Sequence, residues 1–284
     1  MYNYFFDDGE SLYTDLAIER QKADPRINGI TYEKELCLPG YWERVRISSE
    51  EGAKAIGRPL GTYDTLNTAR LDTMDDDGLY DVQEELARRL CTMFGDIAVM
   101  PARILVVGLG NDALTPDSTG PKCAKLVRPT MHIRDWDEEL FDGLECSEIA
   151  VLAPGVGART GMDTGAVVKA VCESICPDAV IAIDSIMTSS RERLGSTVQI
   201  TDTGIFPGGV GNLKTPITRS GVGVPVIGIG VPTVIDSRLL CSALPTDTID
   251  FEPLFISPRE IDEITDNASR VISGAINQAF GLLA

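Results

Sequence analysis

The chain has 284 residues, of which 43% are hydrophobic and 24% charged, so it can bury a sizeable core as one large domain or two small ones. Its 25 basic and 43 acidic residues give a net charge of −18, which repels phosphate backbones and anionic lipid headgroups. We therefore expect no direct binding to nucleic acid or membrane, and no apolar stretch has the length of a membrane-spanning helix.

Cysteine and histidine usage narrows the chemistry. The seven cysteines are odd in number and scattered, without a Cys-x-x-Cys pair, which favours reduced thiols over a disulfide framework or a zinc site. His132 is the only histidine and has no adjacent nucleophile, so we interpret it as a surface or packing residue. We predict no cofactor and no metal site. Because the N-terminus lacks a positive segment followed by an apolar one, we expect a cytoplasmic protein.

The N-terminal part predicts peripheral structure. Residues 1–28 are polar and aperiodic, which predicts an extension. Two alternating runs, 30–38 and 42–48, flank Pro39-Gly40 and predict a β-hairpin.

An amphipathic helix and then an α/β core follow. Apolar residues at Val82, Leu86 and Leu90 predict the helix. After Pro101, short apolar runs alternate with glycine-rich turns and helical stretches, the pattern of buried parallel strands. The predicted strands are 103–107, 148–152, 179–183 and 224–229, and the predicted helices are 120–127, 162–175, 234–241 and 258–283. We predict an α/β fold with three layers, in which helices cover both faces of a mostly parallel or mixed sheet.

Two aspartates follow strands of this predicted sheet, where functional side chains collect in α/β folds. Asp117 lies in the glycine-containing loop after the first core strand, at the start of a helix, where capping is the alternative role. Asp184 directly follows the third strand, and a buried carboxylate there is costly unless it is paired or hydrogen bonded. If the two meet, they form a dyad that shares one proton, in which one carboxylate activates water and the other protonates a substrate carbonyl.

Other interpretations of these loops stay open. Gly108 and Gly110 begin a dinucleotide-binding pattern, but Asp112 or Ala113 stands where the third glycine is needed, and no acidic residue ends the next strand. Three further loop aspartates have either a turn or capping role or a site role: Asp163, Asp202 and Asp236.

Several of these segments resemble the germination protease family of spore-forming Firmicutes. The matching segments run in order along the chain, at 107–111, 115–121, 153–156, 160–161, 177–184, 197–212 and 225–236. The resemblance implies that the family's two essential aspartates are Asp117 and Asp184, the pair already selected from the strand ends. It also implies a fold similar to that of hydrogenase maturation peptidases.

The resemblance further implies an activity. Members of the family are endopeptidases that cleave small acid-soluble spore proteins during germination. The resemblance also implies a homotetramer, located in the forespore or spore core. They are zymogens that remove their own propeptide, cutting after an acidic residue that precedes a hydrophobic residue and Ala. Asp15-Leu16-Ala17 supplies such an autocleavage site, in an extension where we expect the backbone to become accessible. The implied boundaries are 1–15 for the propeptide and 16–284 for the peptidase domain, with a peripheral part at 16–100 and the core at 101–284.

Two departures from the family pattern are present. The chain lacks an insertion between Asp250 and Ser257, and Phe206 stands where some relatives have histidine, so a mechanism that needs that imidazole does not transfer. Two other functions compete with the endopeptidase. A hydrogenase-maturation-type metal-dependent peptidase is disfavoured by the lack of histidine in the matching loops, and an inactive sporulation paralogue is expected to lack a carboxylate or the self-cleavage site.

Overall fold

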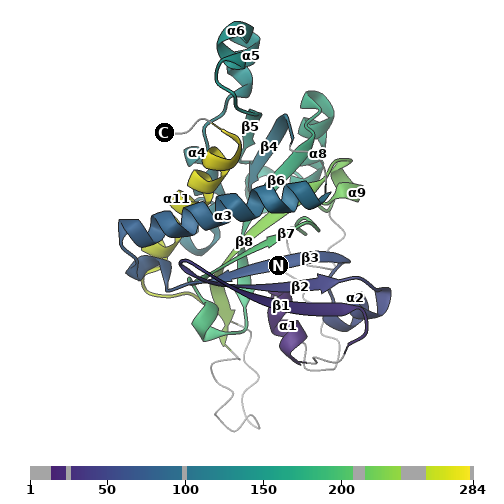
Figure 1. Cartoon of the computed structure of the whole chain (residues 1–284), viewed down its shortest axis with the longest axis vertical. Coiled ribbons are helices and arrows are strands. Elements are labelled where there is room, and N and C mark those ends of the chain that lie inside the picture. Colours follow the sequence, from purple (N-terminus) through teal and green to yellow (C-terminus); the bar gives the residue numbers. More distant parts are fainter. Residues whose placement is uncertain (1–13, 24–26, 98–100, 207–214, 238–253, 282–284) are drawn as a thin grey trace.

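The computed structural model describes residues 14–23, 27–97, 101–206, 215–237 and 254–281. Within these residues, nine strands form one continuous sheet (Figure 1). The strands are β1 (Ile30–Cys37), β2 (Gly40–Ile47), β3 (Gly61–Asn67), β4 (Arg103–Gly108), β5 (Glu148–Leu152), β6 (Ala179–Thr188), β7 (Thr197–Thr201), β8 (Val226–Asp236) and β9 (Phe255–Ile256). Their order across the sheet is β1-β2-β3-β7-β8-β6-β4-β5, and β9 pairs with the end of β8.

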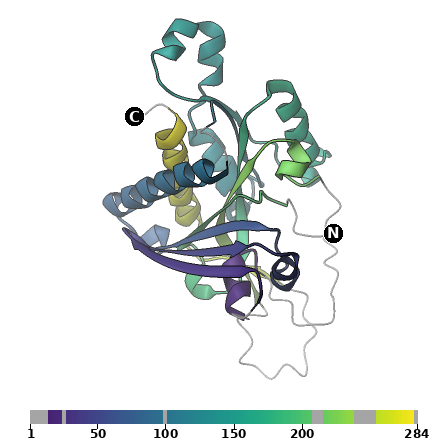
Figure 2. The ribbon, with the colours of Figure 1, turned by 45° about the vertical axis from the view of Figure 1, so that its right-hand side comes forward.

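Helices cover both faces of the sheet (Figure 2). The α-helices are α1 (Ala17–Ala23), α2 (Glu50–Ile56), α3 (Asp76–Ile97), α4 (Thr119–Leu126), α5 (Met131–Trp136), α6 (Glu138–Asp142), α7 (Gly157–Thr160), α8 (Thr164–Ile175), α9 (Arg219–Val222) and α11 (Ile261–Phe280). Short 3₁₀ turns are η1 (Leu71–Thr73), η2 (Thr115–Asp117) and η3 (Arg191–Arg193). The long helices α3 and α11 pack together with α4 on one face, and α8 and α9 lie on the other.

The core strands are buried on both faces. Ile104 and Val106 of β4 belong to the apolar cluster of α3, α4 and α11, whereas Leu105 and Val107 belong to the cluster of α8 and α9. Side chains alternate between the faces of a strand, so a strand covered on both sides reads as one continuous apolar run. The predicted strands of the core therefore match β4, β5, β6 and β8.

The sheet combines a parallel and an antiparallel half. The strands β8, β6, β4 and β5 run parallel, whereas β1, β2, β3, β7 and β8 pair antiparallel. The predicted mixed α/β class is confirmed, and the predicted hairpin is β1 and β2. The helix predicted at 234–241 is wrong for residues 234–236, because β8 continues to Asp236, whereas Ser237 is helical. Residues 238–241 lie outside the described part of the chain.

The segment around α1 differs from the expected extension. Leu16, Ala17 and Ile18 are completely buried and pack with residues of β2, β3 and α2. The sequence reads as polar here because this apolar triplet is too short to show a helical period. The expectation of an accessible backbone is therefore wrong for this part of the segment.

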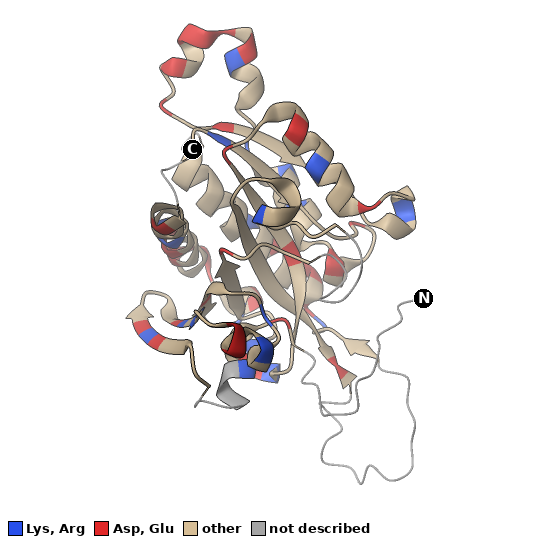
Figure 3. Ribbon diagram, turned by 90° about the vertical axis from the view of Figure 1, so that its right-hand side faces the viewer, with Lys and Arg blue, Asp and Glu red and all other residues tan. Residues whose placement is uncertain are grey.

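The surface shows two further features. The α5–α6 hairpin projects from the body of the molecule and carries mostly acidic side chains among its charged ones (Figure 3). The six cysteines in the described part of the chain are free. No helix in this part is long and apolar enough to cross a membrane.

Candidate active site

Asp117 and Asp184 lie beside the carboxyl end of β4, Asp117 in the loop that follows this strand and Asp184 on the neighbouring parallel strand β6. The prediction that Asp184 directly follows its strand is wrong, because β6 stays paired with β8 as far as Thr188. Gly108 of β4 pairs with Ile183 of β6, and Asp184 follows Ile183 directly. Asp117 is the last residue of η2, which contacts β6. After β4 the chain continues to β5 on one side, whereas after β6 it continues to β7, which lies beyond β8 on the other side. Such a switch point is where α/β sheets hold their functional groups.

The loop after β4 holds Asp117 through backbone contacts. The Asn111 N–H donates to the Asp117 carbonyl oxygen and to its Oδ2, both at 2.9 Å. Gly110 has a φ of +115°, and a Cβ atom there would lie 2.1 Å from the Asp117 carbonyl oxygen. Only glycine fits this backbone conformation and this close approach. The glycine-containing loop thus fixes the direction of the Asp117 carboxylate.

The start of α4 packs directly on β6 at Ile183, next to Asp184. A Cβ atom on Gly120 would lie 2.6 Å from the Ile183 carbonyl oxygen, so the helix can approach this closely only with glycine. The Ser185 hydroxyl donates to Thr119 Oγ1 at 3.1 Å. These contacts tie the helix that follows Asp117 to the strand that carries Asp184.

The two carboxylates are electrostatically coupled. Burial raises the pKa of Asp117, and the hydrogen bond from the Asn111 N–H opposes this rise. The pKa of Asp184 lies well above its ordinary value, first because of burial and then because of the negative charge of Asp117. The Ser185 N–H, which donates to Asp184 Oδ1 at 2.9 Å, offsets part of this rise. Asp184 is therefore the member of the pair that keeps a proton to higher pH.

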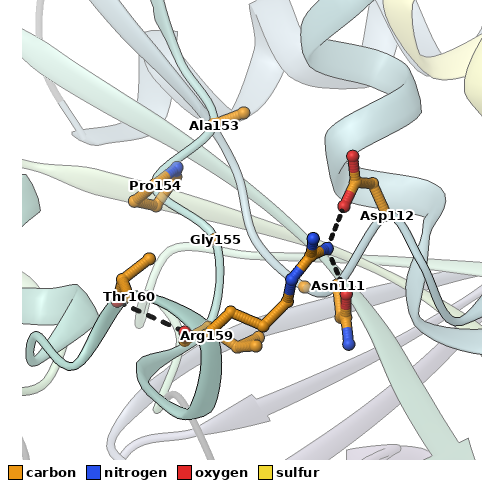
Figure 4. Close-up of a pocket in the computed structure, with 9 residues that line it drawn as sticks. Asn111, Asp112, Ala153, Pro154, Gly155, Arg159 and Thr160 are labelled. Carbon is orange, nitrogen blue, oxygen red and sulfur yellow. Dashed lines mark hydrogen bonds and ion pairs between the residues drawn. The ribbon is translucent and has the colours of Figure 1, made fainter.

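A pocket of about 350 Å³ lies beside Asp117, lined by the loops after β4 and β5 and by α7 (Figure 4). Arg159 reaches across it and donates to Asp112 Oδ1 at 2.7 Å and to Asn111 Oδ1 at 3.1 Å. Because the Asn111 N–H also donates to the Asp117 carboxylate, the pocket adjoins the loop that holds Asp117. Arg159 could not be predicted as a site residue from the sequence, since its contact depends on how two distant loops meet.

The other candidate aspartates have different surroundings. Asp163 caps α8, where its Oδ1 accepts from the Ala166 N–H at 2.8 Å. Asp202 accepts from the Thr62 N–H at 2.8 Å, and burial raises its pKa. Asp236 is buried at the end of β8, opposite Phe255 of β9.

Neither the histidine nor a metal cluster is part of the described site. His132 is exposed on α5, and Phe206 is partly buried at the edge of the described residues. Among the described residues, no group of three or more His, Cys, Asp or Glu side chains could hold a metal ion.

The predicted autocleavage segment lies near the dyad but is enclosed. The Asp15 N–H donates to the Met187 carbonyl oxygen at 2.9 Å, and Leu16 is completely buried. The charge of Asp15 also contributes to the raised pKa of Asp184. Arg58, which binds the Asp15 carboxylate, was not found from the sequence because an isolated arginine after a helix has no distinctive pattern.

Comparison with known proteins identifies the family. A family model described as germination protease matches residues 10–254. The chain belongs to the germination protease family. The resemblance inferred from the loop segments is thereby confirmed, and membership of this family supports a peptidase.

The curated germination proteases match most of the chain. The germination protease of Caldanaerobacter subterraneus subsp. tengcongensis is 33% identical over 94% of this chain and 93% of its own length. That of Priestia megaterium is 36% identical over 85% of this chain and 67% of its own length. Among solved structures, a NiFe hydrogenase maturation protease from Thermococcus kodakarensis covers 66% of this chain and 99% of its own, with 19% identity and a TM-score of 0.36. A TM-score this low supports no conclusion about this chain.

Proposed function

We propose that this chain is an endopeptidase that uses Asp117 and Asp184 as a catalytic dyad. It initiates the degradation of small acid-soluble spore proteins in the spore core during germination, as a homotetramer. It is made as a zymogen that removes residues 1–15 itself. The observation that carries the dyad is the coupling of a carboxylate on β6 with one in the loop after the neighbouring strand β4, where the charge of Asp117 raises the pKa of Asp184.

The different surroundings of the two carboxylates assign their roles. Both carboxylates accept a backbone hydrogen bond, but the pKa of Asp117 is raised less than that of Asp184, so Asp117 ionises first and acts as the base that takes a proton from water. Asp184 keeps its proton to higher pH and gives it to the oxygen of the scissile carbonyl. The water oxygen then bonds to the carbonyl carbon, and a neutral tetrahedral diol forms.

The second half of the reaction returns the protons. Asp117 gives the proton it took from water to the leaving nitrogen, and the carbon–nitrogen bond breaks. Asp184 takes a proton back from one hydroxyl of the diol as the new carboxyl group forms. The dyad thus ends in its starting protonation state, and no covalent enzyme intermediate forms.

Incubation of the purified chain with a small acid-soluble spore protein tests this function. We expect a few defined fragments, which mass spectrometry identifies, and no fragments with Asp117→Asn or Asp184→Asn. Asp163→Asn is the matched control, because it makes the same change in a loop aspartate that caps α8. Equal cleavage by the wild type and the dyad variants would contradict the proposal, as would a stoichiometric covalent adduct of a serine or cysteine reagent that tracks lost activity.

A further inference from the structure

The Asp15 carboxylate is bound by donors from two distant segments. Arg58 Nη2 donates to Asp15 Oδ1 at 2.9 Å, and the Met187 N–H donates to Asp15 Oδ2 at 2.9 Å. Each carboxylate oxygen therefore has its own donor, one of them charged. Bonds of this kind to both oxygens are how proteins recognise a carboxylate rather than an amide.

The backbone around Asp15 is held as well. The Asp15 N–H donates to the Met187 carbonyl oxygen at 2.9 Å, so residue 15 pairs with the end of β6 as an added strand residue would. Arg58 Nη2 also donates to the Thr14 carbonyl oxygen at 2.9 Å. The site thus binds the backbone of an extended peptide by hydrogen bonds and binds one side chain of this peptide by its negative charge.

The surroundings of the Arg58 guanidinium favour an anionic partner. Its side chain is only 11% exposed, and within the described residues its buried Nε donates to no acceptor. A guanidinium this buried is costly without a negative charge beside it. The Asp15 side chain is 40% exposed, so the site is open to solvent on the side from which the carboxylate enters.

The site lies next to the dyad along the same strand. Met187 and Asp184 both belong to β6. Beyond Asp15, Leu16 is buried in the apolar cluster of β2, β3 and α2, and the Ala17 N–H donates to Gln199 Oε1 at 3.1 Å. Three consecutive residues of the chain, one acidic, one apolar and one small, thus each have a separate set of contacts.

We propose that Arg58 and the Met187 N–H form a subsite for the acidic side chain of a peptide substrate, on the amino side of the bond to be cut. Asp15 is the occupant of this subsite in the uncut chain. The inference rests on the proposed endopeptidase function. The ligand class is an Asp or Glu side chain on an extended segment, and Asp15 competes with it.

Peptide binding to the full chain tests the subsite independently of turnover. The probe is a peptide with the sequence of residues 11–20 and a reduced, uncleavable bond between Asp and Leu, paired with a version that has Asn in place of Asp. Calorimetry on the full-length Asp15→Asn chain, in which the internal carboxylate is gone, should show that the Asp peptide binds about 10- to 100-fold more tightly than the Asn peptide. The wild-type uncut chain should bind the Asp peptide more weakly than the Asp15→Asn chain does.

Second substitutions in the Asp15→Asn chain identify the residue responsible. Arg58→Gln should remove the preference for the Asp peptide, and Arg58→Lys, which keeps the charge, should retain part of it. Lys54→Gln is the matched control, because it removes an exposed positive charge from α2 close to Arg58 in the sequence, and it should leave the preference unchanged. Thermal unfolding confirms that each variant is folded.

The outcomes separate the two proposals. Equal binding of both peptides by the Asp15→Asn chain, or an undiminished preference after Arg58→Gln, would overturn the subsite. A preference for the Asp peptide that depends on Arg58, in a chain that cleaves no protein, would support the subsite and contradict the endopeptidase function.

Discussion

The negative charge of Asp117, in the loop after β4, raises the pKa of Asp184 on the neighbouring parallel strand β6. Two carboxylates so placed cannot both ionise freely, and they hold one proton between them over a range of pH. The Asn111 N–H bonds Asp117 and the Ser185 N–H bonds Asp184, so each carboxylate also has a fixed backbone donor. This arrangement leads to the predictions below.

The first prediction concerns the interdependence of the pair. Asp117→Asn and Asp184→Asn should each lower kcat by at least about 10²–10⁴-fold, because an amide neither accepts the proton of water nor shares one with its partner. The double variant should be hardly less active than either single one, since the pair acts as a unit. Peptide hydrolysis followed by mass spectrometry measures this, and strictly multiplicative losses would contradict a shared dyad.

The second prediction concerns stability and pH. The folded state holds the pKa of Asp184 above its unfolded value, so both states are protonated below about pH 4 and Asp184 has no effect there. As pH rises, the unfolded chain ionises first, and the free energy of unfolding falls until the folded pKa is passed. Asp184→Asn lacks this loss, so its stability relative to the wild type should increase as the pH rises above about 4.

Urea unfolding at several pH values checks this prediction, with intact mass confirming that both chains are uncut. If the stability of the variant relative to the wild type did not increase with pH, the folded state would not disfavour the ionised form of Asp184.

The third prediction is a bell-shaped dependence of kcat/KM on pH. Activity should rise as the pair loses its first proton and fall as it loses the second, because one ionised and one protonated carboxylate are needed. Since the pKa of Asp184 is the one held well above its ordinary value, Asp184 sets the alkaline limb. Initial rates on one peptide across the pH range measure both limbs, and a pH-independent rate would exclude the mechanism.

The fourth prediction is that the chain cuts itself between Asp15 and Leu16. The cut should follow first-order kinetics that do not depend on protein concentration, because the segment already lies beside its own dyad. Since Leu16 is completely buried, the segment must first loosen, so a low concentration of urea should accelerate the reaction.

N-terminal sequencing should find a new terminus that begins with Leu16 in the wild type and none in Asp184→Asn. Asp15→Asn should also stay intact, because it lacks the acidic residue. A rate that grows with protein concentration would mean that one molecule cuts another.

The fifth prediction tests the loop that holds Asp117. Gly110→Ala places a Cβ atom 2.1 Å from the Asp117 carbonyl oxygen, at a φ of +115°. Gly223→Ala is the control, since Gly223 has a φ of +88° but nothing within 4 Å of the added atom. The control should lose about 1–2 kcal/mol of stability from the backbone conformation alone. Gly110→Ala should lose about 1–3 kcal/mol more and most of its activity, as measured by urea unfolding and peptide hydrolysis.

The role of a residue could be predicted where the residues adjacent to it in the sequence indicate that role. Asp184 was predictable because it ends a continuous apolar run, although the strand itself continues to Thr188, and Asp117 because it follows a strand and a glycine-containing loop. The strand β3 was missed because its residues look polar. Asp64, for example, is fully buried there because Arg44 at 2.7 Å and Arg89 at 3.4 Å supply its partners from other segments. Such pairing, like the contact of Arg58 with Asp15, arises only once the chain is folded.

The order of strands in the sheet has a consequence for synthesis of the protein. The strand β3 pairs with β2 on one side and with β7 on the other, and β7 follows the whole of α8 and β6 in the chain. During translation the meander of β1, β2 and β3 therefore leaves the ribosome with an open edge, which persists until Thr197–Thr201 has emerged. Open strand edges pair with other chains. We expect a chain truncated before Thr197 to aggregate, and early chaperone binding to determine the yield of the full-length protein.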